Sequence, residues 1–316
     1  MFRIGVNIAG DVISAAVLDE YYNLIGRGVS PSRERRNAEQ LNLDMTYVIN
    51  AAMADAEIDK DYILSIGVAS PGTVDKESGI IEHASNFGYE LVPIRDMLWK
   101  SFDKPIYFEN DANCLALGEY IAGSGAKKGD SLVAVTINKG VGGGIIIDGK
   151  IMGGCNGTAG EIGHTVINVD GEQCTCGRRG CFETYASTSA LIRAAKEALR
   201  DNQDSEMWLI SGGNIDNVEE KTVFEALAMG DALAKKVFDK YVYNVSVGIT
   251  NIVNIFQPST LCIGGAICSL GPVFLNPIKR MVEEQRFSIH SLWQTEICIT
   301  ELGEDAVLIG AALLDE

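Results

Sequence analysis

The sequence predicts an α/β protein in which two related halves each hold a mixed β-sheet covered by helices. Residues 4–18 form the pattern of a strand, a tight glycine turn and a second strand, and residues 131–148 repeat it. Single buried strands that end in glycine turns follow in the same order, over residues 62–72 and 260–266. The repetition indicates an internal duplication. Because the early strands are spaced as antiparallel hairpins, we expect mixed rather than fully parallel sheets.

Helical segments separate these strands. Between residues 38 and 56, apolar side chains recur at steps of three and four, which predicts a helix with one buried face. Residues 231–256 predict a long apolar-rich helix that ends before Pro258, because proline cannot continue a helix. A last helix is expected over residues 305–314. It follows the second half in sequence, and we expect it to pack back on the first.

The length of the chain predicts two domains. Single hydrophobic cores usually stop growing at about 250–300 residues, and this chain has 316. We expect a small lobe over residues 1–122, joined by the C-terminal helix 305–316, and a large lobe over residues 123–304. The boundary is expected near the glycine-rich segment 123–129, with a cleft between the lobes.

Composition and charge exclude several classes of function. Hydrophobic residues make up 47% of the chain and only 7 residues are proline, which is typical of a folded globular protein. The net charge of −17 disfavours binding to the phosphate backbone of nucleic acids. No stretch reaches the ~18–20 uncharged apolar residues of a membrane span, and the chain opens with a strand rather than a leader sequence. We therefore expect a soluble, cytoplasmic protein without nucleic-acid or membrane partners.

Three of the eight cysteines crowd together, and His164 precedes the first of them by ten residues. Three thiolates and one imidazole, from Cys174, Cys176, Cys181 and His164, form a standard tetrahedral zinc set. A reduced loop with incidental thiols is the alternative. Because four protein ligands leave no position for water, we expect the zinc to hold a loop rather than to hydrolyse a substrate. The remaining cysteines are expected to be ordinary small hydrophobic residues: Cys114, Cys155, Cys262, Cys268 and Cys298.

Two glutamates flank the cysteine cluster. Glu161 lies three residues before His164, and Glu183 lies two residues after Cys181. Carboxylates fixed beside a rigid loop are suited to accept hydrogen bonds from a polyhydroxylated ligand. Taken singly, either glutamate would more often be a solvated surface residue. Their position on both sides of the metal ligands favours a binding role.

Asn110 and Asp111 follow a short strand at residues 105–109 and precede a helical pattern. Helix capping alone would explain one such residue, since its side-chain oxygen accepts a hydrogen bond from a free backbone N–H. Two together at the carboxyl end of a strand stand where α/β proteins commonly place catalytic groups. A carboxylate there would take a proton from a hydroxyl nucleophile.

Five motifs together resemble one family across essentially the whole chain, the ROK sugar kinases, and most of all the bacterial glucokinases. The motifs are Glu109-Asn-Asp111-Ala-Asn113, Gly140-Val-Gly-Gly-Gly144, Glu161-Ile-Gly-His164, Cys174-x-Cys176-Gly-x-x-Gly-Cys181-x-Glu183 and Ile263-Gly-Gly265. The glycine turns alone would be weak signals, whereas the acidic and cysteine motifs together are highly specific. The resemblance implies an actin-like ATPase (ribonuclease H-like) fold with two duplicated lobes.

The resemblance also implies a role for each motif. Asp111 is implied as the base that activates the primary hydroxyl of a hexose. The other implied sugar-binding residues are Ser70, Gly72, Asn86, Asn110, Glu161, His164 and Glu183, and His164 is implied to ligate zinc as well. Glycine turns, whose backbone N–H groups form anion-binding concavities, are implied to hold ATP with Mg²⁺. The residues concerned are Gly10, Asp11, Lys139, Gly140, Gly142, Gly264 and Gly265. A homodimer is implied by the resemblance only.

The sequence departs from the family pattern around the phosphates. The first loop usually has Asp-x-Gly-Gly-Thr, whereas this chain has Asn7-Ile-Ala-Gly-Asp11, which loses a carboxylate near Mg²⁺ and adds a charge near phosphate. The second loop usually has Gly-Thr-Gly, and here Asn138-Lys139-Gly140 lacks the threonine. Glu304 stands where asparagine is common. Losing one such ligand or donor costs about 2–4 kcal/mol of transition-state stabilisation.

These departures suggest that Asp11 and Lys139 approach as an ion pair and partly occupy the phosphate site. The alternatives are that Lys139 itself contacts phosphate, or that both side chains are solvated.

Two functions are compatible with the sequence. The first is an ATP-dependent kinase that phosphorylates the 6-hydroxyl of glucose or a related hexose, with Asp111 as base and activity weakened by the altered loops. The alternative is a non-catalytic sugar-binding sensor or regulatory protein of the same fold, with a degenerate ATP site. A DNA-binding repressor is disfavoured, because such proteins carry an N-terminal helix-turn-helix, whereas the first strand here begins near Phe2.

Overall fold

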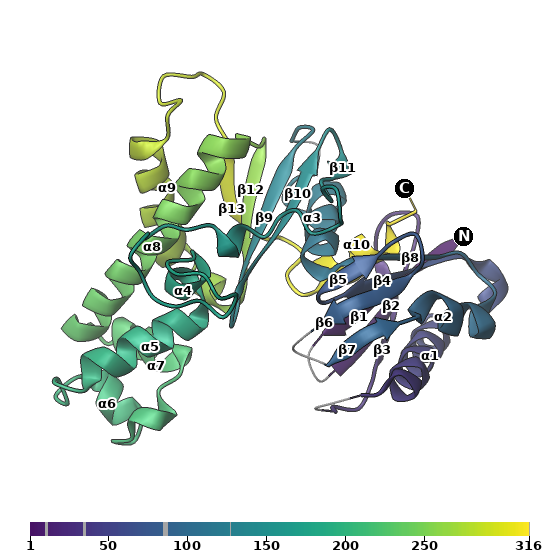
Figure 1. Cartoon of the computed structure of the whole chain (residues 1–316), viewed down its shortest axis with the longest axis horizontal. Coiled ribbons are helices and arrows are strands. Elements are labelled where there is room, and N and C mark those ends of the chain that lie inside the picture. The colour runs from purple at the N-terminus through teal and green to yellow at the C-terminus, as the bar shows by residue number, and fades with distance from the viewer. Residues whose placement is uncertain (10–11, 34–35, 85–87, 127, 316) are drawn as a thin grey trace. The chain divides into compact units, whose positions relative to one another are not determined.

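The computed structural model describes residues 1–9, 12–33, 36–84, 88–126 and 128–315, and these form an α/β protein with mixed sheets, as predicted (Figure 1). The first sheet has the strand order β3-β2-β1-β4-β8. Its strands are β1 (Phe2–Ala9), β2 (Val12–Leu18), β3 (Leu24–Val29), β4 (Ile63–Ser70) and β8 (Ile106–Asn110). Strand β1 pairs antiparallel with β2 and parallel with β4, which in turn pairs parallel with β8. The predicted hairpin and mixed pairing are therefore confirmed.

The second sheet has the order β11-β10-β9-β12-β13. Its strands are β9 (Leu132–Ile137), β10 (Val141–Ile147), β11 (Lys150–Ile151), β12 (Thr260–Gly264) and β13 (Glu296–Ile299). Numbered along the chain within each sheet, both sheets have the order third, second, first, fourth, fifth. The two halves thus share one topology, which is the internal duplication that the sequence predicts.

A third, antiparallel sheet was not predicted. It consists of β5 (Thr73–Asp75), β6 (Ile80–Ala84) and β7 (Tyr89–Val92), in the order β5-β6-β7. The strands are three to five residues long, which is too short for a clear alternation of apolar and polar residues. This sheet follows the end of β4 directly and therefore begins beside Ser70 and Gly72.

Four helices accompany the first sheet: α1 (Ala38–Asp55), α2 (Ile94–Phe102), α3 (Asp111–Ile121) and α10 (Asp305–Ala312). Helix α1 packs on β2 and β3, where glycines allow its backbone to approach closely. A Cβ at Gly28 would lie 2.1 Å from the carbonyl oxygen of Val48. Helix α10 packs on β1, β4 and α3, and a Cβ at Gly310 would lie 1.7 Å from the carbonyl oxygen of Cys114. The start of α3 is thereby fixed against both the sheet and α10.

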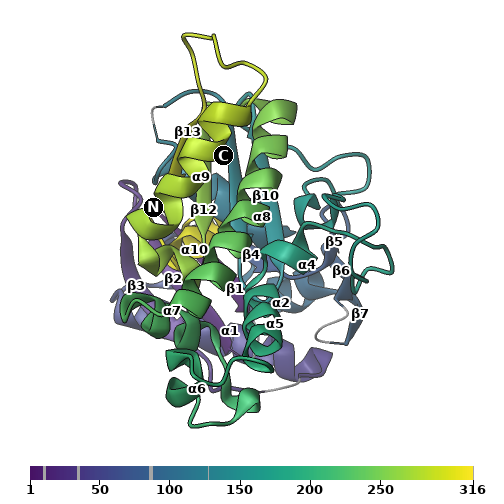
Figure 2. The same cartoon turned by 90° about the vertical axis from the view of Figure 1, so that its left-hand side faces the viewer.

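The remaining helices follow the cysteine cluster in sequence: α4 (Glu183–Ala186), α5 (Thr188–Leu199), α6 (Glu206–Ile210), α7 (Glu220–Ala228), α8 (Ala232–Phe256) and α9 (Pro272–Gln285). The long helix α8 matches the prediction over residues 231–256. The Asp231 side chain caps its first turn by accepting a hydrogen bond from the N–H of Ala234, and left-handed Gln257 ends it before Pro258. Helices α8 and α9 lie side by side (Figure 2).

The described chain divides into two compact units. The first holds residues 1–134, 144–160 and 300–316, and the second holds residues 135–143 and 161–299. The lobe boundaries of the sequence analysis stay a prediction. No helix within the described ranges is both long and apolar enough to cross a membrane.

Candidate functional site

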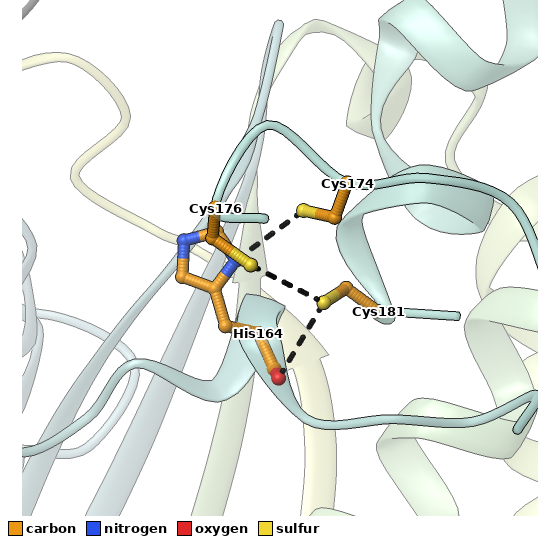
Figure 3. Close-up of side chains that lie close together, drawn as sticks. All are labelled: His164, Cys174, Cys176 and Cys181. Atoms are coloured by element: carbon orange, nitrogen blue, oxygen red, sulfur yellow. Dashed lines mark hydrogen bonds between the residues drawn. The ribbon is translucent and has the colours of Figure 1, made fainter. Parts of the chain in front are cut away.

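The second unit brings together the four residues of the cysteine cluster (Figure 3). One ligand atom from each of His164, Cys174, Cys176 and Cys181 lies within 4.8 Å of the others. The Cys174 Sγ atom is 3.7 Å from His164 Nδ1, and the Sγ atoms of Cys176 and Cys181 are 3.6 Å apart. Thiolates bound to one tetrahedral zinc at ~2.3 Å stand about 3.8 Å apart. The donor set and its spacing therefore fit zinc.

The loop backbone explains how these residues converge. The N–H of Cys174 donates to the carbonyl of Arg178, and the N–H of Gly177 donates to the carbonyl of Cys174, which folds the loop into tight turns. Gly177 and Gly180 have φ values of 89° and 76°, a region that favours glycine. The N–H of Phe182 donates to the carbonyl of Thr165, which fixes the residue after the last cysteine beside the segment after His164.

The cysteine thiols have different acidities. The backbone N–H of Arg178 lowers the pKa of the exposed Cys176 thiol. Burial raises the pKa of Cys181 to about 12. A metal that binds here therefore has to displace a proton from Cys181 at neutral pH.

Glu183 joins the cysteine cluster to the second glycine turn within the same unit. Its Oε2 atom accepts a hydrogen bond of 3.0 Å from the N–H of Val141, and its Oε1 atom lies 3.9 Å from Cys174 Sγ. A Cβ at Gly140 would lie 2.5 Å from Glu183 Oε2, so a side chain there would push this carboxylate away from the turn. The sequence analysis assigned Glu183 to a sugar ligand only. Its contact with the glycine turn required the folded structure.

Further contacts hold the same glycine turn. The N–H of Thr188 donates to the carbonyl of Asn138, and Ser189 Oγ donates to the carbonyl of Lys139. The Lys139 residue is itself exposed. At the end of β12, Gly265 has a φ of 117°, and a Cβ there would lie 2.0 Å from the carbonyl oxygen of Ile137. The two predicted nucleotide-binding turns of this unit, at residues 138–142 and 264–265, therefore both adjoin the end of β9.

Glu161 lies on the other side of His164. Its side chain is 66% exposed, and its Oε2 atom is 3.9 Å from His164 Nε2. The imidazole thus turns Nδ1 to Cys174 and Nε2 toward an exposed carboxylate. This arrangement leaves Glu161 available to a polar ligand while the other ring nitrogen faces the thiols.

The first unit contains the second group of predicted residues, at the junction of β8 and α3. Asn110 caps the helix, because its Oδ1 atom accepts hydrogen bonds from the N–H groups of Ala112 and Asn113. Its Nδ2 atom donates to the carbonyl of Gly72 at 3.3 Å. Asp111 begins the helix, and its Oδ1 atom accepts the N–H of Ala112. Capping by Asn110 leaves Asp111 as a partly exposed carboxylate at a helix N-terminus.

Ser70 and Gly72 end the neighbouring strand β4. Ser70 is paired in register with Asn110, and its buried hydroxyl donates to the carbonyl of Pro71. Gly72 has a φ of 81°, which turns the chain toward Asn110. The structure therefore brings together Ser70, Gly72, Asn110 and Asp111.

Glu109 is a residue of this junction to which the sequence analysis gave no role. It is buried, its Oε2 atom pairs with Lys76, and its Oε1 atom accepts hydrogen bonds from the Asn110 N–H and from Asn113 Nδ2. In the sequence Glu109 stands at the end of a predicted strand and begins the motif of residues 109–113, and neither signal identifies partners that are distant along the chain.

Three predicted residues, Gly10, Asp11 and Asn86, lie outside the described residues. The suggested ion pair between Asp11 and Lys139 therefore stays a hypothesis. On β1, Asn7 Oδ1 is buried and has no hydrogen-bond partner within the described ranges. This position is the one at which the sequence departs from the expected aspartate.

Two five-stranded sheets of identical strand order define an actin-like ATPase fold. Residues 3–316 match the ROK family, and the chain belongs to it.

Relatives within this family include both enzymes and regulators. A glucokinase of Halalkalibacterium halodurans is 33% identical, over 98% of this chain and 94% of that protein. A xylose repressor of Caldicellulosiruptor bescii is 31% identical over 96% of this chain and 73% of the repressor. The crystal structure of a ROK family glucokinase from Streptomyces griseus, in complex with glucose and AMPPNP, is 30% identical with a TM-score of 0.80 and covers 99% of this chain and 98% of its own.

Proposed function

We propose that this protein is an ATP-dependent hexose kinase that phosphorylates the 6-hydroxyl of glucose or a closely related hexose. The proposal rests above all on the position of Asp111. This residue presents a partly exposed carboxylate at the start of α3, and its neighbours at the carboxyl ends of β4 and β8 fix it there. The similarity to two glucokinases supports the choice of reaction and substrate.

In this proposal Asp111 accepts the proton of the sugar 6-hydroxyl as that oxygen attacks the γ-phosphorus of ATP. A bond forms between the sugar oxygen and the phosphorus, and the bond between the phosphorus and the bridging oxygen of ADP breaks. The products are the hexose 6-phosphate and ADP. Glu161, Glu183, His164 and Asn110 are proposed to bind the other hydroxyls, together with Ser70, Gly72 and Asn86.

The nucleotide is proposed to bind with Mg²⁺ at the glycine turns. Gly10, Asp11, Lys139, Gly140 and Gly142 would contact the phosphates, and Gly264 and Gly265 would lie near the adenosine. His164, Cys174, Cys176 and Cys181 would hold zinc, which supplies a rigid support for the loop rather than a reactive water. A homodimer and a cytoplasmic location, where free hexose and ATP occur, complete the proposal.

The test combines binding and turnover in one preparation. Calorimetric titrations with glucose and with Mg-ATP are run beside an assay of sugar 6-phosphate formation. We expect heat from both ligands and product formation, and Asp111→Asn is expected to lower kcat by about 10²–10⁴-fold while glucose still binds. Turnover that survives this substitution would rule out Asp111 as the base.

The alternative function is a non-catalytic sugar-binding regulator. It is supported by Asn7 and Lys139, which depart from the family pattern in the two phosphate loops, and by the similarity to a xylose repressor. This alternative predicts heat of binding on titration with glucose or xylose, no heat on titration with Mg-ATP, and no sugar 6-phosphate. That result would contradict the kinase proposal.

A further inference from the structure

Glu109 is a buried carboxylate two residues before Asp111. Its side chain is 3% exposed, whereas that of its ion-pair partner Lys76 is 40% exposed. A buried carboxylate without a nearby cation strongly destabilises the folded state, whereas well-packed apolar residues in place of a buried ion pair often do not. The presence of the Glu109–Lys76 pair at this place therefore suggests a function beyond stability. The partners of Glu109 indicate that function.

One carboxylate oxygen connects the end of β8 to the first turn of α3. Glu109 Oε1 accepts the backbone N–H of Asn110 at 2.9 Å and Nδ2 of Asn113 at 3.0 Å. These two residues stand on either side of Asp111 in the chain. The carboxylate therefore restrains the backbone from which the Asp111 side chain projects.

The other oxygen faces Lys76, just after β5, at the wall of a pocket of about 470 Å³. Arg95 and Lys150 line the same pocket. The Arg95 guanidinium donates to the carbonyls of Lys76 and Glu77 and lies 5.7 Å from the ring centroid of Phe108, so it holds the backbone of Lys76 in place. The cation that pairs with Glu109 is thus itself positioned.

The Glu109 charge also lies near the interior of α3. Burial, followed by the charges of Glu109 and Asp111, raises the pKa of the Cys114 thiol well above its usual value. Both carboxylates therefore disfavour the charged form of the Cys114 thiol.

We propose that Glu109 is a positioning residue for Asp111 and that Lys76 is the counter-ion that keeps the Glu109 carboxylate in place. The inference rests on the proposed role of Asp111 as base. Displacing a catalytic group by about 1 Å can cost ~10²-fold in rate, so the network has a measurable consequence.

The test is a charge-compensation cycle in the full-length protein. Lys76→Met leaves a buried carboxylate unpaired, and we expect it to lower kcat about 10- to 100-fold while the KM for glucose changes less. Adding Glu109→Gln makes the pair neutral and keeps an oxygen acceptor for Asn110 and Asn113, so it is expected to restore kcat to within about threefold of the wild type. Lys150→Met, in the same pocket, is the matched control and should leave kcat unchanged.

Several results would overturn the proposal: a Lys76→Met protein with wild-type kcat, a double variant no better than Lys76→Met, or a Lys150→Met protein as impaired as Lys76→Met. If Lys76→Met does not fold, Glu109→Gln and Glu109→Ala are compared. Only the alanine variant, which removes the acceptor, should lose about 100-fold in kcat. Equal losses in the two would contradict a positioning role.

A second readout separates this proposal from the kinase proposal. Hydrogen exchange of the peptide covering residues 108–116 is followed in all variants. If wild-type protein forms no product, the kinase proposal fails, but faster exchange in Lys76→Met that is reversed in the double variant still supports the network. Unchanged exchange in Lys76→Met would refute it, whatever the activity.

Discussion

Two glycines of the cysteine loop differ in what surrounds them. Both have positive φ, so a side chain strains the backbone at either position. A Cβ on Gly177 would meet no atom within 4 Å, whereas a Cβ on Gly180 would lie 1.6 Å from the carbonyl oxygen of Asn168. The same substitution therefore measures strain alone at one position and strain with a backbone clash at the other.

We predict that Gly180→Ala lowers the free energy of unfolding by about 3 kcal/mol or more and reduces bound zinc. The matched control, Gly177→Ala, should cost only about 1–2 kcal/mol and keep its zinc. Denaturant unfolding and elemental analysis of the purified variants check both. Equal losses in the two would show that the Asn168 contact does not matter.

Asp44 on α1 is a second residue whose environment has a measurable consequence. Burial opposes ionisation of Asp44, but hydrogen bonds from Arg36 and Gln40 and the charge of Arg33 lower its pKa overall. The folded state therefore holds the Asp44 proton less tightly than the unfolded chain, where the pKa is ~3.9. The resulting stability is present above about pH 4 and is lost as the pH falls through the lower, folded-state pKa.

We predict that Asp44→Asn lowers the free energy of unfolding by about 3 kcal/mol at pH 7, because it leaves the buried Arg36 without its carboxylate. The difference from wild type should shrink as the pH falls below 4. Denaturant unfolding at several pH values measures this. Asp239→Asn, which breaks an exposed pair with Lys235, is the control and should change stability little. A difference independent of pH would contradict the assignment.

At the scale of residues, the sequence predicts what is local or chemically distinctive. The spacing of three cysteines and a histidine predicts their cluster, because few other structures need that set. The capping role of Asn110 also follows from its place before a helix. The pairing of Lys76 with Glu109 could not be predicted, because the two residues are 33 positions apart and nothing in the sequence indicates that they are in contact.

At the scale of elements, the segment after the last cysteine supports the turn between β9 and β10. Glu183, Thr188 and Ser189 contact the turn residues 138–141, and Glu183 also approaches Cys174. The cysteine loop and the glycine turn are therefore expected to be ordered together.

We predict that removal of zinc by a chelator accelerates amide exchange of residues 138–142 by at least about tenfold, because the supporting segment loses its restraint. Exchange in α1, which lies in the other unit, serves as the internal control and should not change. If removal of zinc leaves the amide exchange of residues 138–142 unchanged, Glu183 holds this turn without help from the cysteine loop.

Elements with strong periodicity or clear end signals are predicted well, and short ones are not. Helix α8 is long, capped by Asp231 and followed by Pro258, so its limits are readable. Strands β5, β6 and β7 carry too few residues to show a pattern, and they form a sheet only because β6 pairs with both neighbours.

At the scale of the whole molecule, all four residues of the cysteine cluster belong to one of the two units. Binding to the folded state alone stabilises it by mass action. We predict that a chelator lowers the thermal midpoint of the second unit by several degrees more than that of the first. Exchange of peptides from each unit, followed along a temperature series, measures the two midpoints, and an equal shift in both would contradict the prediction.

The repeated strand order was predictable for the whole molecule because both copies carry a glycine at the same place in the sequence, between their first and second strands. The division into units was less so, because the first unit takes residues 144–160 as well as the C-terminal helix from the second half of the chain, and only the return of that helix was expected. The close approach of Gly144 to Ala112 on α3 belongs to this exchange, and it depends on the packing of a strand against a whole helix.

The repeated topology also places an aspartate twice. Helix α3 follows the fifth strand of the first sheet and begins with Asp111-Ala112; helix α10 follows the fifth strand of the second and begins with Asp305-Ala306. Asp305 is held by both terminal nitrogens of Arg27, at 2.8 and 2.6 Å. If one ancestral segment gave rise to both copies, one acidic helix start was free to diverge into an ion pair with Arg27 on β3, while its twin kept a place suited to chemistry.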